Sequence, residues 1–150
     1  TGIVAVFQAM VSFFILILFM LITSMPVHST LLLFPVVIAP MVLLSVGVSW
    51  ILSSLTVFIR DIGQLVGIAA TIALFISPVF YPVDRLPLNW QPVIYLNPIS
   101  YIVDQMRRIS IYGEMPDWGG LFVYSLVALL VAWCGLALFQ RLRAGFADVL

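Results

Sequence analysis

Residues that could act as nucleophiles or metal ligands are few in this sequence and lie far apart. His28 is the only histidine and Cys134 is the only cysteine. A metal site needs several ligands, and a nucleophile needs a neighbouring base that is held in place by a third group. We therefore interpret His28 as an ordinary loop residue and Cys134 as a packing residue, and we predict no catalytic residue and no metal site.

Carboxylates that could serve an enzyme lie in one stretch between two apolar runs, at Asp84, Asp104, Glu114 and Asp117. An enzyme that is embedded in a membrane and acts on a lipid or a glycan would need such acids at the interface, so this alternative stays open. A phosphate-binding loop of the form GxxxxGK followed by Ser or Thr does not occur in the sequence. The chain is therefore not expected to hydrolyse a nucleotide by itself.

Long apolar runs separate these polar residues and indicate an integral membrane protein. Of the 150 residues, 64% are hydrophobic and 8% are charged, a composition typical of chains that span a bilayer. We predict an all-α membrane protein with a single transmembrane domain over residues 1–150. Four runs without ionisable residues each hold the roughly 20 residues that a crossing helix needs, and the predicted spans are 3–25, 33–59, 62–83 and 119–139.

The second run is too long for a straight crossing and contains Pro35 and Pro40 near its start. Proline lacks a backbone donor and crowds the preceding turn, so we predict an irregular entry with the regular helix beginning near Pro40. An acid or base within a span would mark a proton or ion pathway, and none of the four runs contains one. An ion-coupled carrier is therefore disfavoured.

Small residues recur at helical spacing on two of the predicted spans. Such stripes let two helix backbones approach closely in a medium that offers no hydrophobic drive for association. We interpret them as helix-packing faces, with the lining of a polar conduit as the alternative. The stripes are Ser45, Ser49 and Ser53, and Gly63, Gly67 and Thr71.

The stretch from residue 84 to residue 118 is too long and too apolar for a simple loop. Asn97 followed by Pro98 predicts a helix start, with asparagine as the cap and proline at the first helical position, and Gly113 predicts the helix end. Asp104 precedes Arg108 by one turn, a favourable spacing for an ion pair. Two short re-entrant or interfacial helices are predicted here. The apolar face of the second holds Ile99, Ile102, Val103, Met106 and Ile109, with Ser100 and Ser110 placed elsewhere.

Arginine sets the predicted orientation, because the sequence contains no lysine. Three arginines lie in the short turn at Arg60 and in the tail 140–150, whereas the three on the other side are diluted by the acids of residues 84–118. The positive-inside rule therefore places the Arg60 turn and both chain ends in the cytoplasm, and residues 84–118 on the external side.

The order of several short motifs resembles the permease subunits of type-2 ABC exporters, the family that moves lipid-linked O-antigen, capsular polysaccharide or teichoic acid. The resemblance covers nearly the whole chain. Members of the family carry an amphipathic cytoplasmic helix and two further spans before this point, which implies that the chain is the C-terminal part of a six-span permease. The motifs are an RD turn, an apolar span, SPVFYP, NPISYIVDQMRR, a final span and the tail FADVL.

Residue roles are implied by this resemblance. Arg60 and Asp61 match the cytoplasmic coupling turn close to the ATPase subunit. The family often has an acid where this chain has Ser12, and it prefers Glu where this chain has Asp104. The external gate and re-entrant segment are matched by Pro78, Tyr81, Pro82, Asn97, Pro98, Asp104 and Arg107, and the cytoplasmic tail by Phe146, Ala147 and Asp148.

The resemblance also implies partners and a location. A homodimer in the bacterial inner (cytoplasmic) membrane would export a lipid-linked glycan, and a separate ABC ATPase subunit would bind ATP and Mg, so that this chain holds no cofactor of its own. Membrane lipid is an expected neighbour and nucleic acid is not, because no block of basic residues occurs. Three alternatives remain: an ABC-2 exporter of a drug or small lipid, a membrane-embedded glycan or lipid enzyme, and a channel or structural bundle.

Overall fold

The computed structural model describes residues 2–24, 26–57, 59, 61–79, 87, 89, 94–95 and 97–143. All the regular structure within these ranges is helical. In chain order the elements are α1 (Gly2–Ile22), a 3₁₀ helix η1 (Ser29–Leu33), α2 (Phe34–Thr56), α3 (Ile62–Ile76), α5 (Pro98–Arg107), a π-helix η3 (Arg108–Tyr112) and α6 (Trp118–Arg143).

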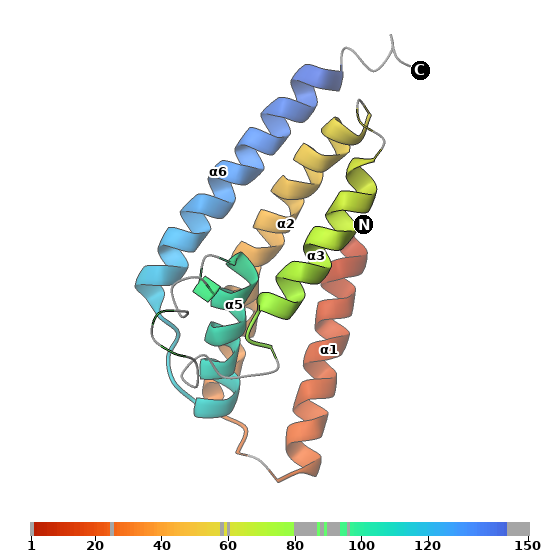
Figure 1. The fold of residues 1–150 in the computed structure, drawn as a ribbon. Helices are drawn as coiled ribbons and strands as arrows, with labels where there is room; N and C mark the ends of the chain where they lie inside the picture. The colour runs from red at the N-terminus through yellow and green to blue at the C-terminus, as the bar shows by residue number, and fades with distance from the viewer. Residues whose placement is uncertain are drawn as a thin grey trace.

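Helices α1, α2, α3 and α6 form one elongated bundle, and α5 packs across its lower part (Figure 1). The end of α2, the start of α3 and the end of α6 lie at the same end of this bundle. The opposite end holds η1, α5 and the start of α6, and is called the α5 end below. This arrangement agrees with the predicted placement of the α2–α3 turn and the C-terminal part of α6 on one side.

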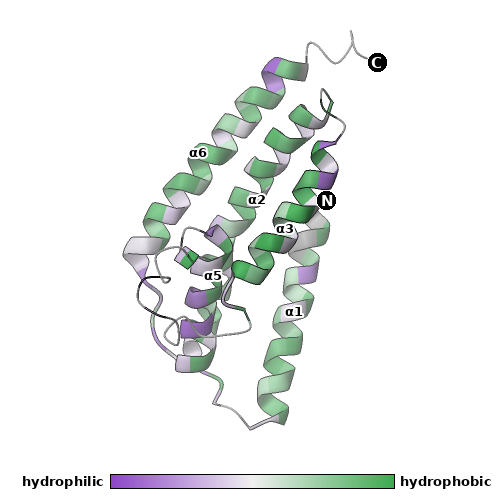
Figure 2. Cartoon of the chain, viewed as in Figure 1, coloured by the Kyte–Doolittle hydropathy of each residue, from purple (hydrophilic) through white to green (hydrophobic). Residues whose placement is uncertain are grey.

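The long helices are apolar on nearly all sides, whereas α5 carries polar residues (Figure 2). Phe14 is 71% exposed and Trp133 is 67% exposed, an outward-facing apolar surface that suits hydrocarbon rather than water. Two helical runs, Ser29–Thr56 and Trp118–Leu142, are long and apolar enough to cross a membrane, and the apolar helices Phe7–Ile22 and Ile62–Ile76 are shorter. Cys134, predicted to be a packing residue, is exposed on α6.

The closest helix contact joins α2 to α6 through glycine. A Cβ atom on Gly47 would lie 2.6 Å from the Cα atom of Ala132, and a Cβ atom on Gly135 would collide with the carbonyl oxygen of Gly47. Both contacts are with backbone, so a side chain at either glycine would force the helices apart. Close backbone approach at small residues is how helices associate in lipid.

The predicted small-residue stripes do not make this contact. Ser45 and Ser49 are exposed, and their hydroxyls donate to the carbonyls of Met41 and Ser45, both at 2.8 Å. Added Cβ atoms on Gly63 and Gly67 would meet nothing within 4 Å. Helical spacing identified stripes of small residues, but the partner helix selected a different face of α2.

The buried core lies at the α5 end, where α5 and η3 pack against α2 and α6. Its central residues are Val37, Ile102, Ile109 and Leu121, with Met106 packed against them. The predicted apolar face of α5 is therefore confirmed for Ile102, Met106 and Ile109. Ser100 and Ser110, predicted to lie off this face, are also buried.

Two helix boundaries differ from the predicted ones, each because of proline. The irregular turn η1 precedes both prolines, and the regular helix α2 begins at Phe34 rather than near Pro40, with Pro35 in its first turn, where a missing N–H costs nothing. Pro40 lies inside the helix. Helix α3 ends at Ile76 rather than at Val83, because Ser77 precedes Pro78 and takes an extended conformation with ψ 139°.

The α2–α6 contact predicts a large effect of one added methyl group. Gly47→Ala should lower the free energy of unfolding by about 1–3 kcal/mol, because the new Cβ atom overlaps backbone that cannot rotate away. Thermal unfolding of the purified protein in detergent measures this change. Gly119→Ala, whose Cβ atom would lie at an ordinary 3.5 Å from Oδ1 of Asp117, is the matched control, and equal melting temperatures for the two variants would contradict the prediction.

Candidate functional site

Asn97 connects the start of α5 to the end of α3. Its side-chain oxygen accepts from the Ile99 backbone N–H at 3.1 Å, which caps α5 as predicted. Its amide nitrogen donates to the carbonyl oxygen of Ala73 at 2.7 Å. The Ala73 carbonyl also accepts from the Ser77 N–H at 3.0 Å, so Asn97 occupies its second lone pair. One side chain therefore starts α5 and fixes it to α3.

Arg107 makes the second connection between the same two elements. Its Nη2 atom donates to the carbonyl oxygen of Pro78 at 2.7 Å, just beyond the end of α3, and the Pro78 side chain is fully buried. A charged donor to a partly buried carbonyl is a strong hydrogen bond. Asn97 and Arg107 lie at opposite ends of α5, so together they fix its position and its direction relative to α3. We call this pair of contacts the α3 clamp.

The far end of α5 is held by η1 and by a tight turn. Thr30 of η1 donates from Oγ1 to the carbonyl oxygen of Ile109 at 2.7 Å. The π-helix then ends at Gly113, which has φ 65°, a conformation that favours glycine. A Cβ atom on Gly113 would lie 2.6 Å from Cγ of the His28 ring. His28 is thus a packing partner of the turn.

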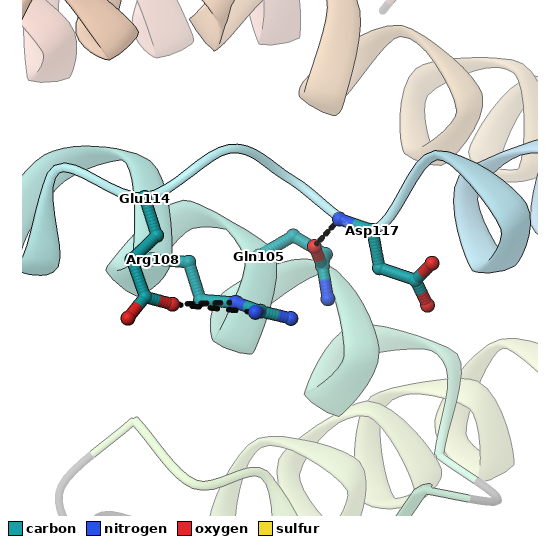
Figure 3. Close-up of polar contacts among 4 residues, drawn as sticks. All are labelled: Gln105, Arg108, Glu114 and Asp117. Carbon is teal, nitrogen blue, oxygen red and sulfur yellow. Dashed lines mark hydrogen bonds and ion pairs between the residues drawn. The ribbon is translucent and has the colours of Figure 1, made fainter.

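The segment after η3 folds back on α5 through two polar contacts (Figure 3). The backbone N–H of Asp117 donates to Oε1 of Gln105 at 2.8 Å, and Gln105 is only 2% exposed. Arg108 forms an ion pair with Glu114, 3.2 Å from Nη2 to Oε2. The buried amide holds the start of α6 beside α5, whereas the exposed ion pair adds little stability.

Tyr101 lies on α5 against α6. Its ring stacks on that of Tyr124, with centroids 5.7 Å apart and planes inclined by 18°, and its hydroxyl donates to the Asp117 carbonyl oxygen at 3.3 Å. Burial, followed by the negative charge of Asp117, raises the pKa of Tyr101 from 10.0 to about 12. Both effects disfavour the phenolate.

The structure brings together four of the residues assigned to the external gate, namely Pro78, Asn97, Pro98 and Arg107. Asp104 lies on α5, half-buried, and the ion pair that the structure gives to Arg108, its predicted partner, is with Glu114. The guanidinium of Arg107 is directed at the Pro78 carbonyl.

Asp61 lies at the opposite end of the molecule, exposed at the start of α3. Its carbonyl accepts from the N–H groups of Gln64 and Leu65, and its negative charge at this position is favourable to the helix dipole. The remaining predicted site residues lie outside the described residues: Arg60, Tyr81, Pro82, Phe146, Ala147 and Asp148.

Two residues that organise this region were missed by the sequence reasoning. Thr30 and Gln105 each bond to backbone that is far away in sequence. Gln105 carried a usable signal, because a neutral amide between Ile102 and Ile109 lies close to an apolar face. Among the described residues, no three of His, Cys, Asp and Glu gather in a group that could hold a metal ion. The contacts that are present join α5 to α3, η1 and α6.

Known proteins resemble this chain over most of its length. A family model described as ABC-2 type transporter matches residues 3–111. An O-antigen export system permease protein RfbA of Klebsiella pneumoniae is 25% identical over 116 residues, which are 77% of this chain and 44% of that protein. A protein of the same name from Myxococcus xanthus is 25% identical over 118 residues, 77% of this chain and 45% of that protein. The chain spans less than half the length of these curated relatives.

The two functions of Asn97 can be separated by substitution. Asn97→Asp keeps the helix cap but loses the donor to Ala73, and should cost about 1–3 kcal/mol of unfolding free energy. Asn97→Ala loses the cap as well and should cost about 1 kcal/mol more. Thermal unfolding in detergent compares the two. Asn89→Asp makes the same substitution at an exposed turn residue and should be neutral. An Asn97→Asp variant as stable as this control would show that the clamp contributes no stability.

The raised pKa of Tyr101 gives a pH-dependent prediction. The fold favours the neutral phenol, so the stability that it contributes is complete below pH 10 and is lost as the pH rises through about 12. The absorbance of tyrosinate at 295 nm, taken as wild type minus Tyr101→Phe, should show a midpoint near pH 12. A difference titration centred at pH 10 would indicate a solvated hydroxyl and contradict the observed packing.

Proposed function

The chain belongs to the ABC-2 type transporter family, and from this premise we propose that it is a permease subunit of an ATP-driven exporter of lipid-linked polysaccharide. The observation that carries the proposal is the similarity of 77% of the chain to O-antigen export permeases from two bacteria. Their identity to this chain is 25%, which supports a related substrate class, such as O-antigen, capsule or teichoic acid.

We place the protein in the inner membrane with four crossings, made by α1, α2, α3 and α6. The α2–α3 turn and the end of α6 face the cytoplasm, and the α5 end faces outward. The positive-inside rule supports this orientation, and the position of the end of α2, the start of α3 and the end of α6 at one end of the bundle supports a shared side for them. Helix α3, with 15 residues, is about 22 Å long, so Pro78 and α5 would lie within the outer part of the bilayer.

The energy for export is proposed to come from a separate ABC ATPase subunit that binds ATP and Mg. Arg60 and Asp61 would form the coupling turn that this subunit contacts, at the cytoplasmic start of α3. A second copy of the permease completes the conduit. The face of α3 with Gly63 and Gly67 supports such packing, because added Cβ atoms there would meet nothing within 4 Å and glycine permits close helix approach.

In this proposal α3 transmits motion from the ATPase to the external helix. None of its residues is buried, so its sides make little contact with the rest of this chain. Its far end, in contrast, is tied to α5 by Asn97 and Arg107, each at 2.7 Å. A displacement of the coupling turn would therefore reach α5 as a movement of the whole helix. Rocking of two such units would open a path for the glycan.

Loss of the clamp should uncouple ATP hydrolysis from export. In the cells that encode the protein, Arg107→Met in the chromosomal gene is expected to lower lipid-linked glycan on the cell surface by about fivefold or more, the effect of losing about 1 kcal/mol of coupling. The amount of permease in the membrane should change less. Surface glycan is measured by antibody or lectin binding and is divided by the permease level.

Arg108→Met is the matched control, because the neighbouring guanidinium binds the exposed Glu114 and no other side chain among the described residues, and it should tolerate the change. Equal losses of surface glycan and of permease in Arg107→Met would reduce the clamp to a structural role. A gene deletion that leaves the surface glycan unchanged would contradict the proposed substrate.

A further inference from the structure

A pocket of about 450 Å³ opens at the α5 end, between α2, α5 and α6. Three tyrosines, Tyr95, Tyr101 and Tyr124, form part of its wall. The remainder is mainly apolar and includes Leu44, Val123 and Val127. On α6 the lining extends from Gly120 to Val127, about 10 Å along the helix axis. The pocket thus begins where α6 begins and continues along its apolar side.

A carboxylate lies at the edge of this pocket. A Cβ atom on Gly120 would be 2.6 Å from Oδ2 of Asp117 and would collide with the hydroxyl of Tyr101. The carboxylate, the phenol and the pocket therefore meet at this glycine. Asp117 is exposed and has no ion-pair partner within the part of the chain that the structure describes. Its negative charge is available to a cation in the pocket.

The wall also contains an unused hydrogen-bond donor. The hydroxyl of Tyr124 is buried and has no hydrogen-bond partner among the described residues. A buried hydroxyl without a partner costs free energy that a ligand acceptor would recover. Tyr124 follows Gly120 by four residues, so it lies about 6 Å further along α6. A ligand would therefore meet a carboxylate first, then a hydroxyl, then apolar side chains.

We propose that this pocket binds one phospholipid with a primary ammonium headgroup, with the ammonium at Asp117 and the acyl region along Val123 and Val127. The tyrosine faces attract a cation through their quadrupoles, and the carboxylate accepts its N–H groups. The Tyr124 hydroxyl donates to an ester oxygen of the lipid. The acyl chain continues on the apolar surface of α2 and α6.

Charge decides between this ligand and other lipids. An anionic headgroup that has no ammonium would be repelled by Asp117. A headgroup without any charge would leave the carboxylate without a partner. The inference requires only that this end of the bundle lies at a membrane surface, and it does not depend on which molecule is exported. The lipid measurement below can therefore fail while export of glycan is intact. Export of glycan can likewise fail while the lipid still binds.

The first test compares two lipids that differ only in their headgroup. The purified full chain in detergent is titrated with dioleoyl phosphatidylethanolamine or dioleoyl phosphatidylglycerol, and bound lipid is counted by native mass spectrometry. One copy of the ethanolamine lipid should bind about tenfold more tightly, the effect of one charge-assisted and cation–π contact. Equal affinities would mean that the pocket holds ordinary surrounding lipid and would overturn the proposal.

Two substitutions locate the bound lipid. Asp117→Asn keeps the backbone N–H that bonds to Gln105 and should reduce binding of the ethanolamine lipid to the level of the glycerol lipid. Tyr124→Phe should weaken binding of both lipids by about fivefold, because only the hydroxyl is lost. Glu114→Gln, a nearby carboxylate paired with Arg108, is the control and should bind normally. Unchanged ethanolamine-lipid binding by Asp117→Asn would overturn the assignment.

Discussion

The carbonyl of Pro78, just beyond the end of α3, needs a hydrogen-bond donor, and this need helps to determine where α5 lies. In apolar surroundings an unpaired carbonyl costs several kcal/mol. Arg107 supplies the donor to Pro78, and Asn97 adds a second donor to the Ala73 carbonyl, which also accepts from the Ser77 N–H. Because these side chains stand at the two ends of α5, satisfying α3 also sets the direction of the shorter helix. The core of Ile102 and Ile109 then forms between α5, α2 and α6.

Polarity in this bundle is arranged inside out relative to a protein in water. Large apolar side chains cover the outer surface, while Gln105, Ser54 and Ser100 are buried. Because lipid is as apolar as leucine, burying leucine gains little, and helices associate through close packing and hydrogen bonds. The α2–α6 contact at Gly47 is the packing part of this arrangement, and the contacts of Thr30, Asn97 and Gln105 are the hydrogen-bonded part. The glycine contact and the hydrogen-bonded contacts lie at different heights along the bundle axis.

Features that depend on local chemistry could be predicted from the sequence, and features that depend on a distant partner could not. Asn97 followed by Pro98 favours a helix start and Gly113 favours a helix end, and the start of α5 and the end of η3 agreed with these predictions. The ion pair of Arg108 could not be predicted in this way. Its partner Glu114 lies six residues further along the chain and comes close only because the chain turns at Gly113. The choice of Gly47 over the serine stripe also depended on which face of α2 meets α6. Several candidate residues, including Arg60, lie outside the described residues.

The π-helix at residues 108–112 marks where the length of this segment can change. A π-helix holds one more residue than an α-helix over the same hydrogen-bonded turn. Removal of one residue there would allow a regular α-helix in which the later residues nearly keep their positions around the axis, whereas removal of one residue within α5 would rotate every later position by about 100°. The latter change would turn Gly113 away from His28 and the Ile109 carbonyl away from Thr30. Single-residue deletions at the exposed positions Ile111 and Tyr112 should thus be tolerated better than deletions within α5.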